Sequence, residues 1–166
     1  MEHSFRAAVF DLDGTLLDTL YDLGACADEA LRHYGFPGHT MEEYRSYIGN
    51  GIPKLIARAV PEGTSEEDIQ KVLRFYLSYY PVHCAEHTRF FPGVAETIRL
   101  LRQRGYALAV LSNKTETTAK KIIAEYFPDE PFCLVWGNNG VRPLKPATDA
   151  GYSLLQELTC RPEEVF

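Results

Sequence analysis

The chain has 166 residues, of which 45% are hydrophobic, and it carries a formal net charge of −6 at pH 7. This length suggests one domain and is sufficient to bury an apolar core. The acidic balance argues against a general nucleic-acid-binding protein, which needs a basic surface. We find no secretory signal and no long apolar span, so we expect a cytoplasmic protein without membrane contact. The four cysteines, which form no CxxC pair, are then expected to be reduced thiols.

The chain begins with a short apolar segment that leads into two aspartates. Residues 5–11 are too few for a helix and predict a buried strand. Since successive side chains of a strand point to opposite faces, Asp11 and Asp13 can face the same way while Leu12 enters the core. Paired carboxylates at the carboxyl end of such a strand suit Mg²⁺ and nucleophilic attack on phosphate. The alternative is a strand followed by an Asp-Gly turn with solvated acids.

Residues 16–87 are predicted to be helical, with no strand among them. In the first helix apolar residues recur at helical spacing, Thr19 and Asp22 resemble a capping box, and Gly35 ends the helix. Three more helices are expected, near 41–48, near 53–60 and from Ser65 to a stop at Pro81.

Strands and helices alternate after residue 90. The apolar patterns predict helices at 94–104, 115–127 and 146–159, and strands at 106–111 and 132–136. Such alternation is typical of right-handed βαβ units and a parallel sheet. We therefore predict an α/β fold, in which a Rossmann-like parallel-sheet core (residues 1–15 and 88–166) is interrupted by an inserted all-helical cap domain (residues 16–87).

Two short patterns in the helical part have more than one interpretation. Gly49, Asn50, Gly51 and the nearby Lys54 suit a turn that cradles phosphate, although an ordinary connection between helices has the same composition. Residues 83–87 match the H-x-x-E-H pattern of inverted zinc peptidases. That pattern requires one uninterrupted helix, and a pair of histidines in a connecting segment is the better interpretation here.

Three motifs follow one another along nearly the whole chain. The first is Asp11-Leu12-Asp13-Gly14-Thr15, the second is the apolar run that ends in Ser112-Asn113-Lys114, and the third is Lys145-Pro146. Their order and spacing resemble those of the haloacid dehalogenase (HAD) phosphatase superfamily. Within it, Tyr47-Ile48-Gly49-Asn50-Gly51 and Phe91-Pro92-Gly93-Val94 make the chain similar to the bacterial phosphoglycolate phosphatase-like group.

The resemblance implies a role for each aspartate. Asp11 would be the nucleophile that forms an aspartyl-phosphate, and Asp13 the general acid and base. Both would bind the cofactor Mg²⁺, Asp13 through its backbone carbonyl. The implied catalytic residues are thus Asp11, Asp13 and Lys145.

The resemblance also implies a set of phosphate-binding residues. Gly14 and Thr15 would form a close turn that leaves backbone N–H groups open for phosphate. Ser112 and Asn113, at the end of a strand, would bind phosphate oxygens, although a plain helix N-cap has the same local sequence. Lys145, expected near a helix N-terminus, would hold the phosphoryl group. In the cap, Gly49, Asn50, Gly51 and Lys54 would face the substrate and select the leaving group.

The sequence departs from the family at its end. Residues 162–166 resemble the entry into the next core strand, beside the first one, whose end carries a fourth, acidic motif that completes the Mg²⁺ site. The chain lacks that motif. We therefore expect either part of a longer protein or weakened Mg²⁺ binding.

The function expected on this basis is Mg²⁺-dependent hydrolysis of a small, phosphoglycolate-like phosphomonoester. The partner would be a small phosphorylated metabolite, and the protein would be a monomer or a homodimer. A sugar phosphomutase of the same fold is one alternative. A non-catalytic phosphate-binding relative, which the missing motif favours, is another.

Overall fold

The computed structural model describes residues 5–129 and 131–166. The chain divides into two compact units, Met1–Leu17 with Phe90–Phe166, and Asp18–Arg89. We call the first the sheet unit and the second the helical unit.

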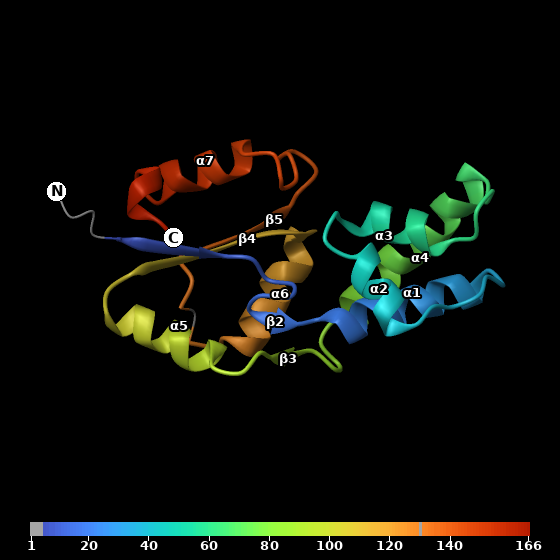
Figure 1. The fold of residues 1–166 in the computed structure, drawn as a ribbon, viewed down its shortest axis with the longest axis horizontal. Coiled ribbons are helices and arrows are strands. Elements are labelled where there is room, and N and C mark those ends of the chain that lie inside the picture. The colour runs from blue at the N-terminus through green and yellow to red at the C-terminus, as the bar shows by residue number, and fades with distance from the viewer. Residues whose placement is uncertain (1–4, 130) are drawn as a thin grey trace. The chain divides into compact units, whose positions relative to one another are not determined.

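The sheet unit contains a three-stranded parallel sheet in the order β1-β4-β5 (Figure 1). The strands are β1 (Ala7–Phe10), β4 (Ala107–Thr115) and β5 (Leu134–Asn138). Ala7 pairs with Ala107, and Ala109 pairs with Leu134. This confirms the predicted α/β fold, but β4 runs four residues beyond the predicted end at 111, because Thr115 still pairs with Asn138 after an irregularity in register.

Three helices cover the two faces of this sheet. In Figure 1, α5 (Val94–Gln103) and α6 (Glu116–Tyr126) lie on one face and α7 (Asp149–Glu157) lies on the other. Each helix buries apolar residues of its inner face, among them Ile98, Ile122 and Leu154. Helix α7 is shorter at both ends than the helix predicted at 146–159.

Residues near the end of the chain lie beside the free edge of β1. After a short 3₁₀ helix (Pro162–Glu164), Val165 forms a parallel bridge with Ala7. The N–H of Val9 donates to the carbonyl of Phe166 at 2.8 Å. The segment therefore lies beside the first strand, as the resemblance implies for the next core strand.

The helical unit consists of four helices around an apolar core that includes three tyrosines, Tyr44, Tyr76 and Tyr80. The helices are α1 (Leu20–His33), α2 (Met41–Tyr47), α3 (Ile52–Ala59) and α4 (Glu66–His83). Large buried side chains include Leu31, Tyr44, Ile56 and Tyr76, and burial of an aliphatic side chain such as Leu31 or Ile56 stabilises the fold by about 1.5–3 kcal/mol. The hydroxyl of Tyr44 donates to Asp28 at 2.5 Å, and burial together with this carboxylate raises the pKa of Tyr44.

Three local expectations for residues 16–87 are wrong. Thr19 occupies the N-cap of α1 without capping it through its side chain, and the carboxylate of Asp22 instead accepts hydrogen bonds from His87 and Thr88. Pro81 lies inside the last turn of α4 rather than ending it. A two-stranded sheet, formed by β2 (Leu17–Asp18) and β3 (Arg89–Phe90), was not anticipated.

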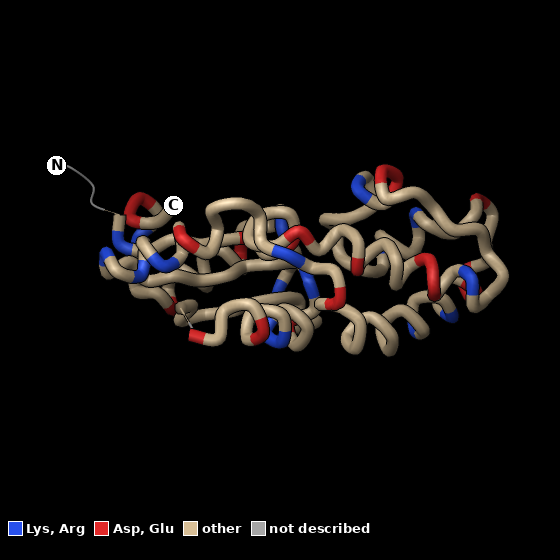
Figure 2. Tube along the Cα trace, turned by 90° about the horizontal axis from the view of Figure 1, so that it is seen from below, with Lys and Arg blue, Asp and Glu red and all other residues tan. Residues whose placement is uncertain are grey.

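The H-x-x-E-H pattern does not form a zinc-peptidase helix. His83 is the last residue of α4, and its Nδ1 lies 2.6 Å from Oε1 of Glu86 in the segment that follows. Within residues 5–129 and 131–166, no helix is long and apolar enough to span a bilayer. Figure 2 shows acidic and basic residues interspersed along both units.

Candidate active site

The residues of the three motifs gather where the parallel strands end. Asp11 directly follows β1, Ser112 and Asn113 lie in the last part of β4, and Lys145 lies in the loop that follows β5. The carboxyl ends of parallel strands are the usual ligand-binding edge of an open α/β sheet. The fold thus brings Asp11, Asp13, Ser112, Asn113 and Lys145 to this edge of the sheet unit.

Asp11 pairs with Lys145. The ammonium of Lys145 lies 3.0 Å from Oδ1 of Asp11, and it also donates to the carbonyl of Leu111 at 2.7 Å. The N–H of Leu12 donates to the same Oδ1 at 2.7 Å, while the Leu12 side chain, in the turn after β1, is fully buried as predicted. The Asp11 side chain is 40% exposed, and no described residue donates a hydrogen bond to its Oδ2. The partly exposed carboxylate therefore keeps acceptor capacity for a ligand.

Asp13 pairs with a second lysine, Lys114, for which the sequence motifs predicted no role. Nζ of Lys114 lies 2.8 Å from Oδ1 of Asp13, and the Lys114 side chain is only 1% exposed. The backbone N–H of Lys114 donates to Oγ of Ser112 at 3.2 Å. Lysine is almost never fully buried without a partner, so the contact with Asp13 is what allows Lys114 to be buried here. The two aspartates and two lysines together carry no net formal charge.

The Gly14 turn uses its backbone N–H groups internally. Gly14 has φ +79°, which glycine adopts without strain. Its N–H donates to the carbonyl of Leu17 at 2.9 Å, and the N–H of Thr15 donates to the carbonyl of Leu12 at 3.3 Å. The open N–H groups expected at Gly14 and Thr15 are thus engaged in the turn itself.

Lys145 is held by Asn113 rather than by a helix. The side-chain amide of Asn113 donates to the carbonyl of Lys145 at 3.0 Å and accepts from the N–H of Lys145 at 2.8 Å. Helix α7 begins only at Asp149, so the predicted helix start at 146 is wrong and Lys145 lies in the preceding loop. A residue before proline is disfavoured in helical conformation, which agrees with the loop conformation of Lys145 before Pro146.

The predicted cap residues lie in the helical unit. Gly49 and Gly51 have positive φ, at +110° and +85°, and Gly51 is the N-cap of α3, in whose first turn Lys54 is exposed. Oδ1 of Asn50 accepts a hydrogen bond from Nη2 of Arg58 at 3.0 Å. Arg58 is thus a cation beside this loop that was not predicted from the sequence.

The residues present fit Mg²⁺ through oxygen donors. No group of three or more His, Cys, Asp or Glu side chains that suits a metal occurs in the described part of the chain. Mg²⁺ does not require one, since it is commonly held by one or two carboxylates together with water and substrate phosphate. The partly exposed Asp11 carboxylate, whose Oδ2 accepts no hydrogen bond from a described residue, suits this role.

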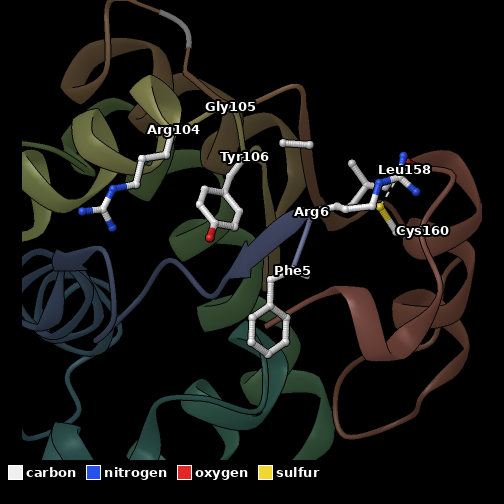
Figure 3. Close-up of a pocket in the computed structure, with 8 residues that line it drawn as sticks. Phe5, Arg6, Arg104, Gly105, Tyr106, Leu158 and Cys160 are labelled. Atoms are coloured by element: carbon white, nitrogen blue, oxygen red, sulfur yellow. Dashed lines mark hydrogen bonds between the residues drawn. The ribbon is translucent and has the colours of Figure 1, made fainter. Parts of the chain in front are cut away.

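A separate pocket lies at the opposite, amino-terminal end of the strands (Figure 3). Its lining includes Phe5, Arg6, Arg104, Tyr106 and Cys160. The guanidinium groups of Arg6 and Arg104 point to opposite sides of it, so they do not converge on a common ligand. None of the predicted site residues lines this pocket.

Comparisons with known proteins identify the family. Residues 8–166 match the family described as haloacid dehalogenase-like hydrolase. The chain is 31% identical to a phosphoglycolate phosphatase of Haemophilus influenzae, over all of this chain and 77% of that protein. It is 32% identical to the phosphoglycolate phosphatase of Chromobacterium violaceum, over 96% of this chain and 74% of that protein.

A solved structure shows the same fold. The crystal structure of a predicted phosphoglycolate phosphatase from Haemophilus somnus superposes with a TM-score of 0.90 at 28% identity, and covers 97% of this chain and 75% of that one. The chain therefore spans about three quarters of the length of these relatives. From the matched profile and the shared fold, we conclude that the chain belongs to the haloacid dehalogenase-like hydrolases.

Proposed function

We propose that this chain is a Mg²⁺-dependent phosphatase that hydrolyses a small phosphomonoester through an aspartyl-phosphate on Asp11. The observation that carries this proposal is the pair of Asp–Lys contacts at the carboxyl edge of the sheet, Asp11 with Lys145 and Asp13 with Lys114. The two lysine ammonium groups place positive charge beside the carboxylates, which suits an anionic phosphomonoester at this edge of the sheet.

In the first step Asp11 attacks phosphorus. A carboxylate oxygen forms the new O–P bond while the bond to the leaving oxygen breaks, and Asp13 donates a proton to that oxygen. The Lys145 ammonium, 3.0 Å from Asp11, neutralises charge on the transferring phosphoryl group. The products of this step are the alcohol and the aspartyl-phosphate.

In the second step water releases phosphate. Asp13, now a carboxylate, takes a proton from a water molecule, whose oxygen attacks phosphorus. The Asp11–phosphorus bond breaks, which restores both the Asp11 carboxylate and the protonated Asp13. Ser112 lies on the same strand end and would contribute its hydroxyl to a phosphate oxygen.

Mg²⁺ would be held by the Asp11 carboxylate and the Asp13 backbone carbonyl. When bound, it would neutralise phosphoryl oxygens that carry negative charge in the transition state. The protein supplies few carboxylates, so substrate phosphate and water would complete the oxygen shell.

We propose a phosphoglycolate-like compound as the substrate. The support is the name of the similar proteins, which are phosphoglycolate phosphatases at 31–32% identity over most of this chain. An alkyl phosphate of this kind has a poor leaving group, which agrees with a general acid at Asp13.

One observation favours a second candidate, a phosphate-binding protein without turnover. Both carboxylates of the site are already paired with a lysine, Asp11 with Lys145 and Asp13 with Lys114, so one oxygen of each is engaged before a metal or substrate binds. Calorimetry with inorganic phosphate separates the two. Binding that is independent of Mg²⁺, without hydrolysis of any ester, would support the binding protein.

Phosphate release from a panel of phosphomonoesters tests the proposed function. With Mg²⁺ we expect the wild-type chain to release phosphate, and we expect Asp11→Asn to reduce the rate at least about 10³-fold because the nucleophile is lost. Addition of a chelator should also abolish release. Net isomerisation of a sugar phosphate, activated by a bisphosphate, would indicate the mutase instead, and equal rates for wild type and Asp11→Asn would refute the phosphatase.

A further inference from the structure

The segment that carries Lys145 has no regular secondary structure of its own. It runs over residues 139–148, between β5 and α7, and we call it the lysine loop. Asn113 fixes the backbone of Lys145 at one point, through hydrogen bonds of 2.8 and 3.0 Å. These hydrogen bonds hold only Lys145, so the earlier residues of the loop, 139–144, must be held by other contacts.

A second anchor holds the loop at Arg142. Nη1 of Arg142 lies 2.5 Å from Oε2 of Glu116 and donates to the carbonyl of Gly137 at 3.2 Å. The guanidinium also lies over the ring of Trp136, with its central carbon 4.1 Å from the ring centroid. Arg142 and Glu116 are 24% and 18% exposed, so water competes weakly for this ion pair.

Glu116 is itself fixed where β4 meets α6. It is the first residue of α6, where the helix dipole favours a carboxylate, and its Oε1 accepts from Lys120 at 2.7 Å. Burial alone would raise the pKa of Glu116, but hydrogen bonds from Lys120 and Arg142 outweigh this effect and bring it to about 2. The carboxylate therefore stays charged at neutral pH.

The two strands approach closely at this anchor. A Cβ on Gly137 would lie 2.5 Å from the Lys114 carbonyl oxygen and 2.5 Å from Cα of Glu116. Only glycine permits β5 to come this near to the start of α6. The anchor is thus built into the backbone of the sheet unit.

We propose that Glu116 is a positioning residue for Lys145, which it holds against Asp11 by fixing Arg142 and thereby the lysine loop. Pro143 and Leu144 alone separate Arg142 from Lys145, so the two anchors, Glu116 and Asn113, clamp the loop from both sides. Because Lys145 has its catalytic role only in the phosphatase mechanism, the consequence for turnover rests on the proposed function. The positioning itself does not.

Hydrogen–deuterium exchange of the whole chain tests the positioning. The N–H groups of Val141, Arg142 and Lys145 are hydrogen-bonded within the loop or to Asn113. We expect Glu116→Gln to speed exchange over residues 139–146 about tenfold, without a similar change in β1 or α5. Lys120→Gln is the matched control, because it removes the exposed partner of Glu116 and leaves Arg142 in place; we expect less than a twofold change.

A second variant tests the positioning independently, in case Glu116→Gln impairs folding. Arg142→Gln removes the other half of the ion pair, and should speed exchange over the same residues. The proposal is overturned if both variants leave exchange in 139–146 within twofold of wild type, or if Lys120→Gln speeds it equally.

Phosphate release gives the functional readout. Glu116→Gln should lower kcat about fivefold and change KM less than twofold, since a displaced ammonium affects the transition state more than substrate binding. Unchanged kcat alongside faster loop exchange would overturn the link to Lys145. If the wild type releases no phosphate, the proposed function fails, while the exchange experiment still decides whether Glu116 positions the loop.

Discussion

Replacement of Lys114 by Met tests the buried ion pair with Asp13. Met retains most of the length and apolar surface of the lysine side chain but removes the charge. Loss of one partner of a fully buried pair costs about 3–5 kcal/mol, because the other charge remains uncompensated. Asp13 is 18% exposed, so water replaces part of the lost contact, and we expect a loss of about 2 kcal/mol in the free energy of unfolding. For a chain of this length that is a fall in Tm of roughly 4–8 °C.

Urea unfolding followed by tryptophan fluorescence measures this loss in the sheet unit. The chain has a single tryptophan, Trp136, which lies in β5. The double variant Lys114→Met with Asp13→Asn removes both charges and should lose less than the single variants in sum, with a coupling energy of about 1–2 kcal/mol. A coupling energy below about 0.3 kcal/mol would refute the reasoning, since it would mean that the two side chains do not interact.

Three further predictions concern stability at other fixed points. Above pH 4.5, Glu116→Gln should lower the free energy of unfolding by about 1–3 kcal/mol relative to wild type. Because the pKa of Glu116 in the folded protein is lowered to about 2, this difference should fade in urea titrations as the pH drops from 4.5 to 2. A difference of the same size at pH 2 would contradict the prediction. Gly137→Ala should destabilise by about 2–3 kcal/mol because its Cβ meets backbone atoms, whereas Gly151→Ala, with no atom within 4 Å of the new Cβ, should be neutral or stabilising. Asp22→Asn should lower the free energy of unfolding, measured by thermal unfolding, by about 1–3 kcal/mol, because the 1%-exposed carboxylate loses acceptor capacity toward His87 and Thr88. The more exposed Asp18→Asn is the control, and an equal or larger loss there would contradict this role of Asp22.

The regular helices and strands could be predicted from the spacing of apolar residues, because that spacing decides which side chains of an element face the core. The predicted strand at 5–11 contains β1, and the predicted helix at 115–127 contains α6. The end of β4 could not be predicted in this way. Residues 112–115 are polar, and they continue the strand only because their backbone meets β5.

The errors arise where a distant residue overrides a local preference. Thr19 and Asp22 have the spacing of a capping box, but Asp22 is bonded by His87 and Thr88, more than sixty residues away. A helix was predicted to begin at Pro146, directly after Lys145, yet Asn113 holds Lys145 in a loop and the helix begins at Asp149. Such contacts leave no periodic trace in the sequence.

Lys114 illustrates the same limit for the site. A lysine in a polar tripeptide is ordinarily solvated, and only the fold shows that Asp13 lies 2.8 Å from its ammonium. The polar residues at the end of an otherwise apolar strand were the one sequence signal that could have indicated a role for Lys114. The roles of Asp11, Asp13, Ser112 and Lys145 in catalysis stay predictions.

Detection of a phosphorylated Asp11 tests the central claim most directly. The Asp13→Asn variant, mixed with Mg²⁺ and p-nitrophenyl phosphate, needs no acid for the good leaving group but lacks the base that activates water. Acid quenching followed by mass spectrometry of the peptide around Asp11 should therefore reveal one added phosphoryl group on Asp11. Asp11→Asn with Asp13→Asn should show none. Release of p-nitrophenol by the protein without any phosphorylated Asp11, or an equal signal in the double variant, would contradict the account.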